Sequence, residues 1–525
     1  MPFPDALVVA HPAGEALHLA SPGWIPGSPP VPVDTHGRRF HVEWDAEAPV
    51  TPLGQLVFFS QFLATAGLFR EWVSRCPLRF ESPNAPTLTN LLGTITLSVL
   101  AGQFRYAHIT GLRADTVNPA GLGMTKVCSE DSVRRAFADA DAEACAKWQI
   151  EALQRTWLPA LRHPWVLDLD VTIKPIYGHQ EGAEVGYNPH KPGRPSHAYH
   201  TLMIRSLRLV LDVKVHPGKE HSAGHGRPNL WRFWESLPPE CRPQLVCGDA
   251  SYGQEALLAD CEVRQQKYLF RQRQTKGVKQ LVRALEAQGG WRPTLNDWEA
   301  LEGTLQLTGW TQRRRVVVLR RRKARPGSRA VLMGTQAPEL ELIGESETAG
   351  YEYQILVTNL TLELLSIADL YRQRADIENA YDELKNQWGW GGFMSRDLLR
   401  CQVAARNVAL IYNWWSLFVA CAEPARGREA ITSRPLLLSA VGRLTESGRQ
   451  LTLTLTSTHG EAAYAQGLLT QISLFLSGLK NTAEQLSSAA CWERIWERIL
   501  SPYLRPRAAI PARSLRVVSR IFRAR

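Results

Sequence analysis

Apolar residues recur at helical spacing between about residues 52 and 157. Leu53, Leu56, Phe59 and Leu63 form one such series, and similar series follow along this stretch. Their spacing predicts a helical region. The residues before it, 1–50, are rich in proline and glycine, which predicts an irregular arm.

One segment of the helical region carries the sequence signal of a helix N-terminus. Ser129, Glu130, Asp131 and Ser132 stand directly before a basic stretch, as the N-cap of a helix does. A helix-turn-helix unit and a plain helical bundle both fit this pattern.

The pattern changes at about His163, where apolar and polar residues begin to alternate. The stretch Trp165–Ile173 is rich in β-branched residues and predicts a strand. Further elements are expected by the same criteria: two strands within 197–215, short strands at 244–247 and 267–271, and a helix at 251–260. Strands mixed with helices in this order predict an α/β or α+β core.

A second alternating stretch runs from about residue 290 to 359 and predicts a β-rich insertion. Its expected strands are 303–308, 315–320, 330–333 and 351–358. One long helix is expected over Leu364–Trp388. After Arg396 the spacing is again helical, followed by a stretch rich in serine, threonine and leucine and by a basic tail.

The positive charge of the chain is concentrated. The net charge is +11, from 61 basic and 50 acidic residues. Nine cations and no acid lie between residues 312 and 329, and seven arginines and no acid lie in Arg505–Arg525. This distribution favours a polyanionic partner, most simply nucleic acid. A solvated basic hairpin with a frayed tail is the alternative.

Several classes of protein are excluded. The longest apolar run, Ala409–Ala422, is shorter than the ~20 residues that span a bilayer. The N-terminus has no signal-peptide pattern, and nine cysteines without a Cys-x-x-Cys pair favour a reducing cytoplasm over disulfides or zinc. The histidines of 179–225 match no zinc spacing. No phosphate-binding loop is present, so ATP is not expected.

Acidic residues mark the ends of two expected strands. Asp168 and Asp170 alternate with Leu169, so both carboxylates should face one side of the sheet. Asp249 follows the apolar residues of the next short strand, a common place for active-site acids in open sheets. A polar strand edge and a helix N-cap are the alternatives for these positions.

A third acid lies on the expected long helix. Tyr371, Arg374, Glu378 and Lys385 are separated by three, four and seven residues, which keeps their side chains on one helical face. A surface ladder of ion pairs would have the same spacing.

Together these segments resemble a known family. The pattern Asp-x-Thr on one strand, Gly-Asp-x-x-Tyr-Gly after another, and Tyr-(2)-Arg-(3)-Glu-(6)-Lys on a helix is similar to that of the DDE transposases of bacterial insertion sequences. The closest resemblance is to the cut-and-paste branch that carries the Tyr-Arg-Glu-Lys helix. It covers roughly residues 160–400.

The resemblance implies a fold of mixed α/β class. An RNase H-like catalytic core would be interrupted by a β-rich insertion and flanked by helical N- and C-terminal regions. The implied division is an arm at 1–50, a helical DNA-binding domain at 51–160, the first part of the core at 161–289, the insertion at 290–360, the last core helix at 361–400, and a helical region with a basic tail at 401–525.

The resemblance also implies the chemistry. Asp170, Asp249 and Glu378 would hold two Mg²⁺ ions, with Mn²⁺ able to substitute, because carboxylate oxygens suit hard cations. Water would first release a 3′-hydroxyl at each transposon end, and that hydroxyl would then attack target DNA. Asp168 is the alternative for the first acid.

DNA contacts are expected from the same helix and from the insertion. Arg374 and Lys385 would hold backbone phosphates, and Tyr371 would contact the same strand or pack the helix. Trp298 is a candidate to stack on a flipped base, with Trp291 and Trp310 as alternatives. Within the basic run, Arg314 and Arg321 are the candidate contacts.

The expected partners are double-stranded DNA, as transposon ends and as target, and a second copy of the chain in a synaptic homodimer. The expected location is the bacterial cytoplasm, at the nucleoid when DNA is bound. Two alternatives stay open: an RNase H-like nuclease that cuts without joining, and a non-enzymatic DNA-binding protein derived from a transposase.

Overall fold

The computed structural model describes residues 30–43, 45, 48–188, 191–323, 350–424, 427–456, 460–482 and 485–504, with the backbone of two short strands before them. The chain divides into two units, Met1–Ala48 and Pro49–Arg525. In the first unit, where an irregular arm is expected, the strands pair as antiparallel hairpins: β1 (Val9–Ala10) with β2 (Ala16–Leu17), and β3 (Val31–Asp34) with β4 (Arg39–Val42).

Helices occupy the stretch where helical spacing predicts them. They are α1 (Leu56–Ala66), α2 (Leu68–Ser74), α3 (Leu88–Leu100), α4 (Asn118–Gly121), α5 (Glu130–Arg135) and α6 (Ala142–Trp157), with 3₁₀ helices η1 (Tyr106–Leu112) and η2 (Leu158–Arg162). The side chain of Ser129 accepts a hydrogen bond from the Ser132 amide, as its predicted N-cap role requires. Gly67 has a φ of 68°, which a glycine adopts easily, and the chain turns there from α1 into α2.

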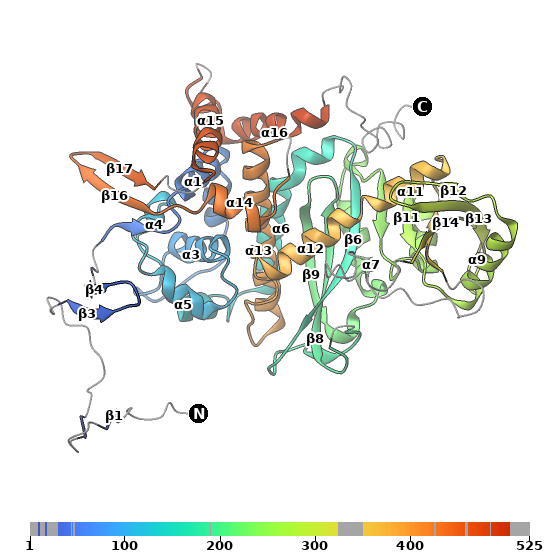
Figure 1. Ribbon diagram of the computed structural model, residues 1–525, viewed down its shortest axis with the longest axis horizontal. Coiled ribbons are helices and arrows are strands. Elements are labelled where there is room, and N and C mark those ends of the chain that lie inside the picture. The colour runs from blue at the N-terminus through green and yellow to red at the C-terminus, as the bar shows by residue number, and fades with distance from the viewer. Residues whose placement is uncertain are drawn as a thin grey trace. The chain divides into compact units, whose positions relative to one another are not determined.

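The N-terminal and C-terminal helices share one apolar core. The later helices are α13 (Leu398–Ala422), α14 (Ala430–Leu437), α15 (Ala462–Lys480) and α16 (Ser488–Leu504). The ring of Trp72 stacks on Trp148 with centroids 5.4 Å apart and meets Trp414 of α13 edge-on. In Figure 1 α15 and α16 lie beside α1 and α13. Aromatic contacts of this kind join sequence-distant helices into one structural unit.

The central sheet mixes parallel and antiparallel strands. Its five core strands are β6 (Val166–Pro175), β8 (Pro195–Ile204), β9 (Leu209–Pro217), β10 (Leu245–Gly248) and β11 (Tyr268–Arg271). Across the sheet the order is β9-β8-β6-β10-β11, in which β6, β10 and β11 are parallel and β8 is antiparallel to its neighbours. The helices α7 (Ala223–Ser236) and α8 (Glu255–Val263) connect its later strands. A mixed α/β fold is therefore confirmed.

The strands expected as an insertion continue this sheet. They are β12 (Arg292–Pro293), β13 (Trp298–Leu305), β14 (Arg314–Arg322) and β15 (Tyr351–Thr358), preceded by α9 (Lys276–Gln288). Because β15 pairs antiparallel with β11, the core sheet, the short edge strand β7 (Glu184–Val185) beside β8 and the four added strands form one ten-stranded sheet. The strand expected at 330–333 lies outside the described residues. The boundaries proposed between domains stay predictions.

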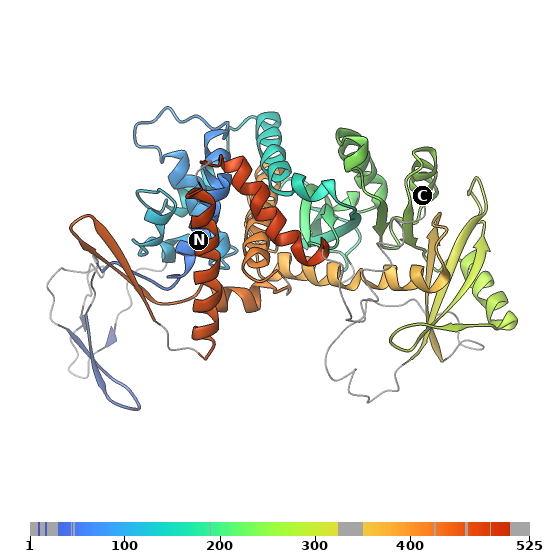
Figure 2. The same ribbon diagram turned by 90° about the horizontal axis from the view of Figure 1, so that it is seen from above.

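The expected long helix over Leu364–Trp388 is wrong in one respect, because it is two helices. They are α11 (Leu364–Arg372) and α12 (Ala375–Asn386). At the junction the amide of Arg374 donates to the carbonyl of Tyr371, three residues back, so the turn is tighter than an α-helical one. Figures 1 and 2 show the two helices following one another in nearly the same direction.

The C-terminal part is not helical throughout. The stretch rich in serine, threonine and leucine forms a hairpin of β16 (Gly442–Ser447) and β17 (Gln450–Leu455), which is joined by β5 (Val50–Thr51). Threonine and leucine alternate along β17, which is a period-2 pattern suited to a strand. The basic tail lies outside the described residues. None of the described helices is both long enough and apolar enough to cross a membrane.

Candidate active site

Strand register brings Asp170 and Asp249 to the same edge of the sheet. The strands β6 and β10 are parallel, and Leu169 opposite Gly248 is their last paired position. Asp170 and Asp249 are the next residue on each strand. Since the carboxyl ends of parallel strands meet at one edge, this is the usual position of a site in an open α/β sheet.

The guanidinium of Arg374 links the acids of β6 to that of α12. Its nitrogens lie 3.2 Å from Asp168 Oδ1, 3.4 Å from Asp170 Oδ2 and 3.0 Å from Glu378 Oε1. Asp168 and Asp170 therefore face the same side of the sheet, as their alternation predicts. The side chain of Arg374 is only 5% exposed, while that of Glu378 is 53% exposed.

Asp249 is held in place by a turn rather than by a helix. Its Oδ1 accepts hydrogen bonds from the amide of Ser251, at 2.9 Å, and from its hydroxyl, at 2.6 Å. The following helix, α8, begins only at Glu255 with Gln254 as its N-cap residue. The N-cap alternative for Asp249 is therefore wrong, and one carboxylate oxygen is left for other partners.

Asp168 and Asp170 have different surroundings. The side chain of Asp168 is fully buried, and its Oδ2 accepts hydrogen bonds from Nε and Nη2 of Arg205, the first of them at 2.9 Å. The side chain of Asp170 is 18% exposed, and its polar partners among the described residues are a backbone amide and Arg374. Asp168 is thus the buried counter-ion of Arg205, while Asp170 is the more accessible of the two acids.

Arg205 is a site residue that the sequence pattern does not reveal. It follows directly after β8, and its Nη1 also donates to the carbonyl of Leu370 in α11 at 2.9 Å. It therefore ties the helix before Arg374 to the acids of β6. A single arginine after an apolar strand is the only local signal, and many surface positions share it.

Electrostatics at this edge favour a bound cation. Burial raises the pKa of Asp170 to about 7, and the charges of Asp249 and Asp168 also raise it, while Arg374 lowers it. Several carboxylates in a partly desolvated site repel one another unless positive charge lies between them. Here Arg374 supplies the only close positive charge that Asp170 has among the described residues.

The donor chemistry fits hard divalent cations, but the side chains are not arranged around a metal. Carboxylate oxygens are the ligands that Mg²⁺ prefers. Within the described ranges, no three histidine, cysteine or acidic side chains are grouped closely enough to hold an ion. Because Arg374 lies among the acids, ligation by Asp170, Asp249 and Glu378 together would require side chains to change rotamer.

The other predicted residues of α11 and α12, Tyr371 and Lys385, differ in exposure. Tyr371 is 7% exposed, and burial raises its pKa to about 12. It belongs to a small apolar cluster with Ile367 and Leu370, so the structure supports its packing alternative. Lys385 is half-buried, and no ion pair of its ammonium group occurs within the described part of the chain.

The tryptophans of the added strands all lie beneath arginine side chains. Trp298 is 7% exposed, and the guanidinium carbons of Arg321 and Arg372 lie 4.9 Å and 5.7 Å from its ring centroid. Trp291 and Trp310 have the same kind of partner, at 4.1 Å and 5.0 Å. Because cation–π partners lie against these rings, stacking on a flipped base would require arginines to move.

The basic run of β14 is largely neutralised. Arg314 is buried and ion-paired with Glu255 and Glu262, and Arg321 is ion-paired with Glu352. Two further pairs bridge neighbouring strands, Arg315 with Glu302 and Arg320 with Glu299. The described part of the run is therefore mostly ion-paired, which matches neither a free DNA-binding surface nor the solvated basic hairpin of the alternative. Arg321 retains 42% exposure of its side chain.

Arg314 should contribute to stability rather than to DNA binding. Arg314→Met leaves the carboxylates of Glu255 and Glu262 without their shared cation, so we expect a loss of about 1–3 kcal/mol in the free energy of unfolding. Arg313→Met is the matched control, because Arg313 is the exposed neighbour. Denaturant unfolding measures the difference. Equal midpoints for the two variants would contradict the structural role of Arg314.

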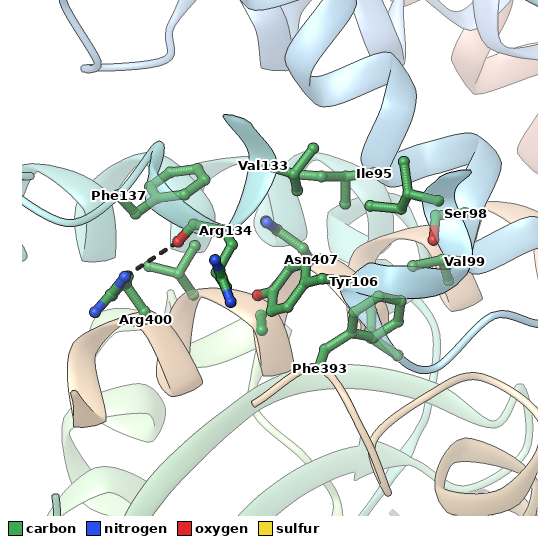
Figure 3. A pocket seen from close by; sticks show the side chains of 14 residues that line it. Ile95, Ser98, Val99, Tyr106, Val133, Arg134, Phe137, Phe393, Arg400 and Asn407 are labelled. Carbon is green, nitrogen blue, oxygen red and sulfur yellow. Dashed lines mark hydrogen bonds between the residues drawn. The ribbon is translucent and has the colours of Figure 1, made fainter. Parts of the chain in front are cut away.

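One pocket with a mostly apolar lining lies in the helical part and not at the acidic edge. It has a volume of about 30 Å³ and is lined by side chains of α3, η1, α5 and α13 together with Phe393. Figure 3 shows Tyr106 and Asn407 facing it, and Arg400 donating to the carbonyl of Arg134. A cavity of this size has room for water but not for a nucleotide.

Comparisons with known proteins identify the family of this domain. The family model described as "Transposase DDE domain group 1" matches residues 79–476. No curated protein matches the chain. Among solved structures, the cryo-EM structure of the piggyBac transposase synaptic complex with hairpin DNA is similar at 11% identity, covering 88% of this chain and 87% of that one, with a TM-score of 0.36. A likeness that weak carries no argument about this chain.

Proposed function

Because the chain belongs to the family of the group 1 transposase DDE domain, we propose that it moves a bacterial insertion sequence by cut-and-paste transposition. It would bind the terminal inverted repeats, cut the strands there and join the freed ends to target DNA. The observation that carries this proposal is the placement of Asp170 and Asp249 directly after the last paired residues of the parallel strands β6 and β10, with Glu378 tied to the same place through Arg374.

The proposed site residues have distinct roles. Asp170 and Asp249 present carboxylate oxygens at the sheet edge, and Ser251 fixes the orientation of Asp249. Glu378 is exposed enough to swing toward them from α12. When bound, two Mg²⁺ ions, or Mn²⁺ in their place, would activate the attacking oxygen and neutralise the negative charge on the leaving oxygen.

Arg374 holds the site together in the absence of such ions. Its guanidinium supplies positive charge among Asp168, Asp170 and Glu378. With bound cations neutralising those acids, Arg374 would be free to hold a phosphate of the bound strand. Lys385, about two turns beyond Glu378 on α12, is proposed to hold a second phosphate.

The proposed partners follow from the activity. They are double-stranded DNA, as element ends and as target, and a second copy of the chain that holds the paired ends as a homodimer. The helical region before β6 is the proposed reader of the end sequence, and the basic tail a non-specific DNA contact. The proposed place of action is the nucleoid in the bacterial cytoplasm.

A cleavage assay on the ends of the source element tests the proposal. With Mg²⁺, the wild-type chain should nick a labelled duplex at the element end and join it to a target plasmid. Glu378→Ala should reduce both products to a small residual level while DNA binding persists, because one of the three acids is lost. The matched control is Asp382→Ala, one turn along the same helix, where the exposed side chain contacts only Asn386.

Three results would contradict the proposal. Cleavage that is unchanged in Glu378→Ala would mean that the third acid is wrongly assigned. Cutting without any joined product would identify a nuclease. Binding without cleavage in the wild type would identify a DNA-binding protein that has lost the enzymatic activity.

A further inference from the structure

Two tyrosines near β7 (Glu184–Val185) are the most exposed tyrosines that the structure describes. Tyr177 and Tyr187 are 63% and 61% exposed, whereas Tyr464 and Tyr503 reach 43%. Both lie in the segment that connects β6 to β8, after the strand that carries Asp170. The Lys191 amide donates to Asn188 Oδ1, which links the cation beside Tyr177 to the residue that follows Tyr187. Exposed aromatic side chains on one connected segment mark a surface that binds a partner.

Free positive charge surrounds Tyr177. The ammonium of Lys191 lies 5.0 Å from its ring centroid, and the guanidinium carbon of Arg194 lies 4.8 Å from it. The Lys191 ammonium also donates to the Tyr177 hydroxyl, which lowers the pKa of that hydroxyl. Neither cation is ion-paired with a carboxylate among the described residues, in contrast to the arginines of β14.

Tyr187 is paired with a histidine in a stacked arrangement. The ring centroids of Tyr187 and His221 are 5.5 Å apart, with an interplanar angle of 29°. His221 Nδ1 also accepts a hydrogen bond from the Tyr187 amide at 3.4 Å. An offset pair of flat rings at the surface provides a ready stacking face for a further flat ring.

Close backbone contacts hold this surface in shape. A Cβ atom on Gly186 would lie 2.0 Å from the carbonyl oxygen of Gly218, so the chain before Tyr187 is pressed against the turn after β9. Glu181 fixes the middle of the segment, because its carboxylate accepts from the Leu398 amide at 2.9 Å and its amide donates to Arg396. The tyrosines are therefore presented by a braced segment.

The segment that carries the tyrosines begins a few nucleotide lengths from the proposed cutting site. Five residues of β6 separate Asp170 from Pro175, which is about 17 Å at the rise of a strand. A DNA strand advances about 3.4 Å per nucleotide, so this corresponds to roughly five nucleotides. A strand bound at the acids could reach the tyrosines without bending back.

We propose that Tyr177, Tyr187, Lys191, Arg194 and His221 form a binding surface for a DNA strand with unpaired bases. The bases stack on the tyrosine rings and the two cations bind the backbone phosphates, the combination by which proteins hold single strands. The inference rests on the proposed function, because it assigns to this surface the strand that is separated near the cut.

Binding of a tailed duplex tests the surface. The probe is a fluorescent duplex of the element end that carries a single-stranded oligothymidine tail of about 10 nucleotides, compared with the same duplex without the tail. Tyr177→Ala with Tyr187→Ala should weaken binding of the tailed probe by about 5- to 100-fold and leave the blunt probe nearly unchanged. The Phe variants at both positions should bind as wild type, because they keep the rings.

The controls separate this inference from the proposed function. Tyr464→Ala removes another exposed tyrosine beside an arginine and should leave both affinities unchanged. If the double variant binds the tailed probe as wild type does, while the wild type still cuts, the surface is wrong and the proposed function stands. If the wild type binds neither probe, both are wrong. If the double variant weakens binding of the tailed and the blunt probe equally, the surface does not bind unpaired bases and the inference is overturned.

Discussion

Asp170→Asn should abolish DNA cleavage and leave the folded protein at least as stable as the wild type. The substitution keeps the shape of the side chain but removes the negative charge that a cation would neutralise. Asp170 is the accessible acid of β6, directly after the last residue that pairs with β10, and Asp168 on the same face is buried. We expect cleavage to fall by about 10³-fold or more, the scale of losing one electrostatic partner of a reaction.

The effect on stability has a definite sign. Burial raises the pKa of Asp170 from its ordinary 3.8 to about 7. Between these two values the unfolded chain has lost the proton and the folded chain keeps it. The free energy of unfolding of the wild type should therefore decrease as the pH rises from about 4 to 7. Asp170→Asn lacks this contribution, on the order of 1–4 kcal/mol, and should be the more stable protein near neutral pH.

Denaturant unfolding at several pH values, with divalent cations removed by chelation, measures this difference. Cleavage of the labelled element end is measured on the same preparations with Mg²⁺ restored. A variant that unfolds earlier than wild type throughout the pH range would show that Asp170 is needed for the fold. Such a result would remove the argument for Asp170 as the first catalytic acid.

Local pattern predicts the strands and the positions of the acids because both are local properties. Alternation over 165–173 predicts β6, and it also places Asp168 and Asp170 on one face, which their shared contact with Arg374 confirms. The position of Asp249 after a short apolar strand likewise follows from neighbouring residues. A strand end is visible in sequence because the apolar run stops there.

The break between α11 and α12 is not visible in sequence because one tightened turn preserves the helical spacing. Tyr371 and Glu378 lie on different helices, although their separation fits a single face. No glycine or proline marks the junction at Arg374. Contacts of its guanidinium with three acids, two of them on another element, stabilise the position. Tertiary contacts of this kind override local helix propensity.

The neutralisation of the charge on β14 is another feature that cannot be predicted from the sequence alone. The arginines form a cluster in the sequence, but the acids that neutralise Arg314 come from α8, more than fifty residues earlier. Such pairing depends on how β14 is positioned beside α8, which no local pattern encodes. Lys191 and Arg194, which have no acidic partner among the described residues, lie instead in a short segment with little excess charge.

Asp168→Ala should destabilise the protein more than any other substitution considered for this sheet edge. The variant leaves the guanidinium of Arg205 buried without its carboxylate partner, because the remaining hydrogen bond of that group is to the carbonyl of Leu370. Removal of one partner from a buried ion pair costs about 3–5 kcal/mol. We therefore expect a lower unfolding midpoint and poor folding at growth temperature.

A second variant separates a structural role of Asp168 from a catalytic one. Asp168→Leu combined with Arg205→Met replaces the buried pair by apolar groups of similar size, and such exchanges often restore stability. If the pair is structural, the double variant should regain much of the unfolding free energy, measured with denaturant, and should keep some cleavage activity because Asp170 is intact. If it is stable but cuts no DNA, while Asp170→Asn still cuts, then Asp168 is the first catalytic acid, and the assignment made from its burial is wrong.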